Sequence, residues 1–380
     1  MKTLIIGGGL SGLALAERLE AQGQDYHVLE ARDRFGGRIM TEQLDGSYFD
    51  LGPAWFWPGQ PRIEKLTARL GLKRFSQFAT GELTYEDARG PVQRGLGFAS
   101  MEGSWRLEGG LSRLTDALQD RLPQARKQVN AQVTGLEQTG NGIRATLSDG
   151  SAVKADRVVL AMPPRLAAGL VFSPALPTAA LQAMTSVATW MAGQAKAVAV
   201  YERAFWREAG LSGDAISRRG PMIEIHDASP AEGGPYALFG FIGVPPKARA
   251  DEQALREAIE AQLMRLFGKD AAAPRALFIK DWAFDPLTAT LADAEPQYSH
   301  PAYGLPLALE NLWEGRLILA GTEVAKGFGG YIEGALEAAE TALERLEAKE
   351  HAYRKARDRR TYGRNLKEKC KGQSDDPPTR

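Results

Sequence analysis

The chain has 380 residues and a single cysteine, Cys370, and this scarcity excludes several kinds of site. One cysteine cannot form an intrachain disulfide, a cysteine-based zinc site or an iron–sulfur cluster. It fits a reducing compartment, most simply the cytoplasm. The histidines show no metal-ligand spacing; they are His27, His226, His300 and His351. We therefore predict no metal site.

Long apolar runs and an excess charge are lacking as well. Nowhere do about 18 consecutive apolar residues occur, so no membrane-spanning helix is expected. The apolar run Thr3–Ile6 stops at glycines and does not match a signal peptide. The 47 basic and 47 acidic side chains balance, which removes the general electrostatic case for binding nucleic acid. These absences predict a soluble protein.

The remaining composition is that of a globular protein. Apolar residues make up 44% and charged residues 25%, and the length allows two to three domains. Residues 352–371 differ, with nine Lys and Arg against two acids. We interpret residues 349–380 as a basic, solvated and partly disordered tail. A weak site for anionic lipid or nucleic acid is the alternative.

The first thirty residues form a predicted strand–helix–strand unit. A buried strand, Thr3–Ile6, precedes a helical pattern, and a second strand, Tyr26–Leu29, ends at Glu30. The turn between the first strand and the helix matches G-x-G-x-x-G; its residues are Gly7, Gly8, Gly9, Leu10, Ser11 and Gly12. Such glycines permit a tight turn, close approach to a pyrophosphate and close helix–strand packing. A carboxylate at the position of Glu30 accepts hydrogen bonds from ribose hydroxyls. The motif predicts a dinucleotide site without separating NAD from FAD.

Further elements follow from periodicity and turn signals. Amphipathic helices are predicted at 61–71, 111–122 and 252–267, and a long helix beginning near Ile332. Strands are predicted at 133–138, 143–147, 151–153, 158–161, 195–201, 236–244, 277–282 and 317–320.

The residues after Glu30 resemble the flavin-containing amine oxidase family, the monoamine oxidase-like branch of the glutathione reductase-type FAD proteins. Residues 31–38, A-R-D-R-F-G-G-R, are similar to the family's A-R-x-R-x-G-G-R. The resemblance extends over about residues 3–347. It continues at 50–55, 109–111, 133, 161–164, 320–323 and 330–335.

The resemblance implies FAD as cofactor and names the residues around it. These are Gly7, Gly9, Leu10, Ser11, Gly12, Glu30, Ala31, Arg32, Gly36, Gly37, Arg38, Gly52, Pro53, Ala54, Trp55, Val133, Ala161, Pro163, Gly321, Glu323, Gly330, Tyr331 and Ile332. It implies that Arg38 neutralises the pyrophosphate and that Glu323 binds the ribityl or phosphate region. The helix beginning near Ile332 would direct its N-terminus toward the flavin. Because Cys370 lies far from the family's flavin-linking position, the FAD is expected to be bound non-covalently.

The resemblance also implies the fold: a two-domain α/β protein with an FAD-binding Rossmann-like domain and an inserted α+β substrate domain. We expect the FAD domain at 1–75, 105–165 and 305–348. The substrate domain is expected at 76–104 and 166–304.

Three residues are implied to act in catalysis: Lys196, Tyr331 and Trp282. In the family, a lysine before an F-W pair holds a water near the flavin and aids the reaction with oxygen. Here Lys196 precedes Phe205-Trp206; an edge-strand lysine facing solvent is the alternative. Tyr331 matches one wall of an aromatic cage, whereas residues 288–292, T-A-T-L-A, supply neither the second aromatic nor the linking cysteine.

The expected activity is oxidation of an amine to an imine, with hydride transfer to the flavin and reoxidation by molecular oxygen to give hydrogen peroxide. Trp55 stands where amino-acid oxidases place an arginine, which argues against an amino-acid substrate. Residues 55–57 line an aromatic entrance or pack in the core. The missing cage wall keeps two alternatives open: a flavin-dependent desaturase or dehydrogenase of a larger hydrophobic substrate, and a non-catalytic flavin-binding scaffold.

Overall fold

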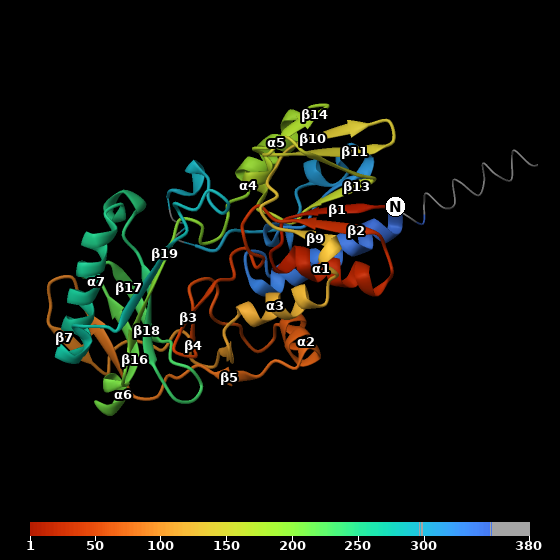
Figure 1. Cartoon of the computed structure of the whole chain (residues 1–380). Helices are drawn as coiled ribbons and strands as arrows, with labels where there is room; N and C mark the ends of the chain where they lie inside the picture. The colour runs from red at the N-terminus through yellow and green to blue at the C-terminus, as the bar shows by residue number, and fades with distance from the viewer. Residues whose placement is uncertain (296, 298, 350, 352–380) are drawn as a thin grey trace, which may run out of the picture.

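Two lobes lie side by side in the structure, a computed structural model that describes residues 1–295, 297, 299–349 and 351 (Figure 1). Residues 352–380, with Cys370, lie outside the described residues, so the predictions for the basic tail stay predictions. No helix in the described part of the chain is long and apolar enough to cross a membrane.

The first lobe is built on a five-stranded sheet in which every strand pair is parallel. In spatial order its strands are β20 (Leu317–Leu319), β13 (Arg157–Leu160), β1 (Thr3–Ile6), β2 (Tyr26–Leu29) and β9 (Lys127–Gln128). The sheet is covered on both faces, which explains why its strands read as continuous apolar runs rather than alternating ones. These strands confirm the predicted strand–helix–strand unit and the Rossmann-like topology.

Helices cover one face of this sheet. They are α1 (Leu10–Ala21), α2 (Pro61–Leu70), α3 (Ser112–Asp120) and a helix over residues 332–349. Ile5 of β1 packs there with Leu13 of α1 and Leu336 of the C-terminal helix. The first and last elements of the chain therefore share one core, and the ends of the sequence meet at the sheet.

The other face packs on a second, four-stranded sheet. Its strands are β12 (Ala152–Ala155), β11 (Gly142–Leu147), β10 (Val133–Thr139) and β14 (Val171–Ser173). The helices α4 (Pro164–Ala167) and α5 (Thr178–Ser186) pack in the same core through Ala167, Ala180 and Met184. Residues 164–186 thus belong with the first lobe. The division expected at residue 166 does not coincide with this packing, because β14 pairs with β10.

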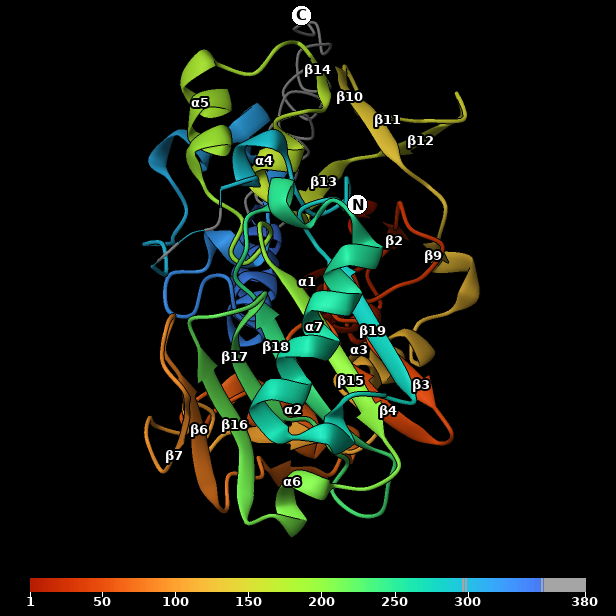
Figure 2. The ribbon, with the colours of Figure 1, turned by 90° about the vertical axis from the view of Figure 1, so that its left-hand side faces the viewer.

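The second lobe is a seven-stranded sheet with a helix across one face (Figure 2). Its strands are β19 (Ala276–Asp281), β15 (Ala195–Tyr201), β18 (Tyr236–Ile242), β17 (Met222–Asp227), β16 (Leu211–Ser217), β6 (Glu82–Glu86) and β7 (Val92–Arg94). The helices α7 (Glu252–Phe267) and α6 (Phe205–Glu208) bury one face. Periodicity predicted β15, β18, β19 and α7 but missed β6, β7, β16 and β17.

The opposite face of that sheet meets the first lobe. Two small antiparallel, two-stranded sheets lie at this junction: β3 (Thr41–Leu44) with β4 (Ser47–Asp50), and β5 (Arg74–Ser76) with β8 (Trp105–Leu107). Phe49 and Trp55 form a core there with Val198 and Phe239. Alternation along β15 turns Ala197 toward α7 and Val198 toward the first lobe. The same alternation directs Lys196 to the junction.

Candidate active site

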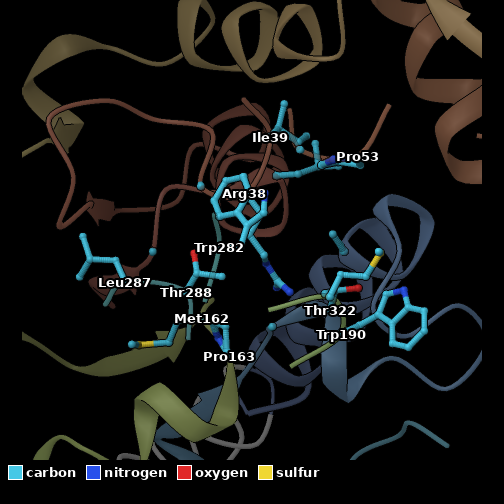
Figure 3. Close-up of a pocket in the computed structure, with 18 of the residues that line it drawn as sticks. Arg38, Ile39, Pro53, Met162, Pro163, Trp190, Trp282, Leu287, Thr288 and Thr322 are labelled. Carbon is cyan, nitrogen blue, oxygen red and sulfur yellow. The ribbon is translucent and has the colours of Figure 1, made fainter. Parts of the chain in front are cut away.

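A cavity of about 770 Å³ lies between the lobes, and residues of both lobes line it (Figure 3). It brings together the glycine motif, the end of β2, the turn after β13, Lys196, Trp282 and the start of the C-terminal helix. Of the residues predicted to contact FAD or substrate, all but Gly12 and Glu323 line the cavity. Segments separated by more than three hundred positions therefore contribute to one site.

Glu30 is held in a defined orientation at the end of β2. Its two carboxylate oxygens accept hydrogen bonds from the backbone N–H groups of Gly8 (2.7 Å) and Arg32 (2.8 Å). Helix α1 begins nearby after Gly9, which has no side chain to cap the first turn, so the free N–H groups there suit a phosphate. This donor and acceptor set fits the ribose and pyrophosphate of a dinucleotide.

The glycines of the motif have separate physical roles. Gly7 has φ +110°, and a Cβ there would lie 2.4 Å from the carbonyl oxygen of Ala161. A Cβ on Gly12 would lie 2.0 Å from the carbonyl oxygen of Gly7. Gly12 therefore supports the site by close helix–strand packing, as the motif predicts, and does not itself reach the cavity.

Arg38 extends toward the middle of the cavity, between Thr288 and Thr322 (Figure 3). Its guanidinium donates a hydrogen bond of 2.6 Å to Oε1 of Glu323. Glu323 is fully buried, and its Oε2 has no hydrogen-bond partner among the described residues. Because Glu323 does not line the cavity, its contact with Arg38 indicates that it holds the Arg38 side chain in place. Direct contact of Glu323 with the cofactor stays a prediction.

Arg32, also from the loop after β2, is tied to the segment that follows β19. Its guanidinium binds both carboxylate oxygens of Asp285, at 2.9 and 3.0 Å, and Thr288 Oγ1 at 2.9 Å. Lys280 Nζ lies 2.8 Å from the same carboxylate. Burial would raise the pKa of Asp285, but the hydrogen bonds from Arg32 and Lys280 hold it below its usual value. This network fixes one wall of the cavity, and the motif analysis did not identify Asp285.

Lys196 is buried in an interior strand of the seven-stranded sheet. Its Nζ donates a hydrogen bond of 2.5 Å to the carbonyl oxygen of Gly52. Burial lowers the pKa of Lys196 to about 8, although the Asp50 carboxylate opposes this change. The alternative of an edge-strand lysine facing solvent is therefore wrong. An amine that exchanges its proton near neutral pH lines the cavity at this point.

Aromatic side chains border the cavity around Lys196. Trp282 is buried, and its indole N–H donates a 3.0 Å hydrogen bond to the carbonyl oxygen of Leu51. Tyr331 stacks on His300 with ring centroids 4.9 Å apart, and Trp190 meets the same imidazole edge-on. Trp190 lines the cavity with Tyr331 and was not predicted. Where the second cage aromatic was sought, Thr288 lines the wall instead.

Trp55 combines the two roles that its sequence context allowed. It lines the cavity, yet it is mostly buried and packs edge-on against Phe239 at 4.9 Å. Phe241 and Glu224 line the same cavity and were not predicted. Phe241 lies in a predicted strand but in no motif, and Glu224 lies on β17, which carries no clear periodicity. The polar Glu224 within the apolar run Met222–Ile225 was the one available signal.

Comparisons with known proteins agree with this geometry. A family model described as flavin containing amine oxidoreductase matches residues 10–97 and 96–346. The chain is 25% identical to a probable flavin-containing monoamine oxidase A of Dictyostelium discoideum, over 88% of this chain and 94% of that protein. It is 24% identical to the flavin-containing amine oxidase B of Sus scrofa, over 90% of this chain and 85% of that protein.

Solved structures share the fold. A wild-type putrescine oxidase bound to putrescine superposes with a TM-score of 0.77 at 22% identity, covering 91% of this chain and 99% of that one. The cyclohexylamine oxidase from Brevibacterium oxydans superposes with a TM-score of 0.78 at 21% identity, covering 92% and 99%. These likenesses confirm the predicted fold class, and the family match confirms the resemblance seen in the motifs.

Proposed function

The chain belongs to the flavin-containing amine oxidoreductase family with FAD as its cofactor, and we propose that it oxidises a small amine with oxygen as electron acceptor. One observation carries the proposal: a single cavity joins the dinucleotide motif to a buried lysine and to Trp190, Trp282 and Tyr331. The FAD would be held without a covalent link, since residues 288–292 offer no cysteine. We also propose that the protein is located in the cytoplasm.

Binding of FAD would use groups that are already oriented. The Glu30 carboxylate would accept hydrogen bonds from the adenosine ribose, and the N-terminal N–H groups of α1 would hold the pyrophosphate. Arg38, positioned by Glu323, would add a cation beside it. The C-terminal helix begins at the cavity with Ile332, where its dipole favours negative charge on the bound ring. When bound, FAD supplies the hydride acceptor and the route for electrons to oxygen.

The protein's side chains would then orient the amine and exclude water. Trp282, Tyr331 and Trp190 supply apolar faces that suit an uncharged amine and its carbon chain. Lys196 would hold a water molecule with its amine, and its lowered pKa lets it carry or release a proton near neutral pH. Trp55 provides no cation at the position where amino-acid oxidases place an arginine, which argues against an amino-acid substrate.

An anaerobic amine screen tests the proposal. Purified protein should be yellow, and at least one small amine should bleach the flavin absorbance without oxygen; admitting oxygen should restore it and release hydrogen peroxide. Acid precipitation should leave the flavin in the supernatant. Colourless protein, or flavin that no amine reduces, would contradict the activity, and flavin that stays with the pellet would contradict non-covalent binding.

A further inference from the structure

The segment that follows β4 accepts a hydrogen bond from each of two predicted catalytic residues. The carbonyl oxygen of Leu51 accepts the indole N–H of Trp282 at 3.0 Å, and the carbonyl oxygen of Gly52 accepts Lys196 Nζ at 2.5 Å. A carbonyl group belongs to the backbone, so its direction depends on what holds this segment in place. Asp50, the last residue of β4, immediately precedes the two carbonyl groups and does not line the cavity.

The buried carboxylate of Asp50 anchors the segment at the start of α3. Its Oδ1 accepts the hydroxyl of Thr41 at 2.5 Å, the residue opposite it in the β3–β4 pair, and the backbone N–H of Leu111 at 3.0 Å. Leu111 is the N-cap residue of α3 and makes no side-chain capping bond of its own. Thr41 Oγ1 in turn accepts the N–H of Ser112 at 3.1 Å. The carboxylate and the hydroxyl thus satisfy free N–H groups at a helix end whose dipole favours negative charge.

On its other side, the segment packs against the loop that follows the dinucleotide motif. The N–H groups of Leu51 and Gly52 both donate to the carbonyl oxygen of Met40, at 2.9 and 3.3 Å. A Cβ on Gly52 would lie 2.1 Å from the carbonyl oxygen of Arg38, so a glycine permits this close approach. The segment is held from two sides, which fixes the direction of its two carbonyl groups.

The same carboxylate acts on the charge of Lys196. Burial lowers the pKa of Lys196 to about 8, and the negative charge of Asp50 opposes this change. Burial raises the pKa of Asp50 to about 6, against the hydrogen bond from Thr41 and the positive charges of Arg106 and Lys196. Between about pH 6 and pH 8 the carboxylate is therefore ionised while the lysine is protonated. In this range each charge stabilises the other inside the protein.

The other charged groups near the pair have partners of their own. Arg106 of β8 donates to two backbone carbonyl groups. Lys280, opposite Lys196 in the β15–β19 pair, binds the Asp285 carboxylate at 2.8 Å. The side chains of β18 that face Lys196 are aromatic rings. Asp50 therefore supplies the negative charge that acts on Lys196.

We propose that Asp50 is a positioning residue that acts on the reaction through Lys196 and Trp282. Its anchored carboxylate directs the two carbonyl groups that accept hydrogen bonds from these side chains, and its charge keeps Lys196 in the ammonium form. The inference rests on the proposed function, in which Lys196 holds a water molecule and carries a proton in the cavity. Asp50 acts from behind the cavity wall, since it does not line the cavity itself.

NMR of lysine isotopically labelled at Cε reports the ionisation of Lys196 directly, in the full-length holoenzyme with oxidised flavin. The resonance that Lys196→Met lacks belongs to Lys196, and in the wild-type protein it should titrate at about pH 8. Asp50→Asn keeps the shape of the side chain and removes its charge, so the midpoint should fall by about one pH unit. Asp120→Asn, at the exposed last residue of α3, is the matched control and should leave the midpoint unchanged.

The wild-type titration gives a second test that needs no variant at position 50. Because Asp50 takes up a proton at about pH 6, the Lys196 resonance should show a smaller second step there. Equal midpoints in the wild type and Asp50→Asn overturn the proposal. A wild-type titration without the second step overturns it as well, even if Asp50→Asn does not fold.

Reoxidation of the flavin measures the consequence for the reaction. The flavin is reduced by light without oxygen, so no amine is needed, and its reoxidation rate is then followed against pH. The inflection should move to lower pH in Asp50→Asn by the same amount as the Lys196 midpoint. An inflection that stays in place, or none in either protein, overturns the role of Asp50 in the reaction. If both shifts are seen but no amine reduces the flavin, the proposed amine oxidation fails and the assignment of Asp50 stands.

Discussion

Replacing Lys196 with methionine should stabilise the protein while impairing its reaction with oxygen. Methionine keeps the length of the side chain and removes the charge. Burial lowers the pKa of Lys196 from 10.5 to about 8, which corresponds to a cost of about 3 kcal/mol for keeping the charged form folded. Losing the hydrogen bond to Gly52 lowers the stability of the variant by about 1 kcal/mol and offsets part of this gain. The free energy of unfolding at pH 7 should therefore rise by about 2 kcal/mol.

The pH dependence of this gain follows from the direction of the pKa change. The folded protein releases the Lys196 proton at about pH 8, whereas the unfolded chain keeps it up to about pH 10.5. Between these values the unfolded chain binds more protons, so wild-type stability rises with pH. Below pH 8 both states are charged and the full cost remains. The advantage of the variant should hold at pH 7 and disappear by about pH 10.5.

Thermal unfolding of the two holoenzymes at equal FAD concentration measures this difference. For a chain of this length, 2 kcal/mol corresponds to about 3 °C in Tm. Lys154→Met, at an exposed strand position, should leave Tm unchanged. Stopped-flow mixing of the reduced enzyme with oxygen should show slower flavin reoxidation only in Lys196→Met. A lower Tm at pH 7, a pH-independent difference, or an unchanged reoxidation rate would refute the reasoning.

Two further substitutions test the supports of the site. Gly12→Ala should give protein that is poorly folded or free of flavin, because its Cβ would meet the Gly7 carbonyl, whereas Gly140→Ala has open space and should bind FAD normally, as fluorescence titration can measure. Asp285→Asn should lower the free energy of unfolding by about 2 kcal/mol at pH 7, since Arg32 lies partly buried against it. Because the pKa of Asp285 is lowered in the folded protein, this loss should shrink below about pH 4, where the unfolded wild-type chain takes up a proton before the folded one; an equal loss in urea unfolding at pH 3 and pH 7 would contradict it.

Local patterns were enough to predict the N-terminal strand–helix–strand unit and the dinucleotide motif within it. The apolar run Thr3–Ile6, the glycine motif and Glu30 follow one another directly, so local spacing determines their geometry. Helix α1 and strand β2 are confirmed for the same reason. Lys196 stood out in the sequence because it is the one charged residue in the apolar strand Ala195–Tyr201. Burying a charged side chain without a partner costs free energy, so a role for this residue was expected.

The second lobe was harder to predict because its strands are paired over long distances. Strand β6 joins β16 across more than a hundred residues, and β14 joins β10 of the first lobe, which moved the expected boundary at residue 166. Short strands of mixed polarity carry little periodicity of their own. Their pairing partners, and thus their faces, are decided by the whole sheet.

The sequence by itself pointed to a dinucleotide cofactor, because such a cofactor is recognised by turns, helix ends and a carboxylate that lie within one strand–helix–strand unit. Only the tertiary structure decided the partners of the charged groups. Arg38 binds Glu323 and Arg32 binds Asp285, partners that lie 285 and 253 positions further along the chain. Such contacts depend on which segments the fold brings together around the cavity. This arrangement produces no periodic pattern in the sequence, so it could not be predicted from the sequence.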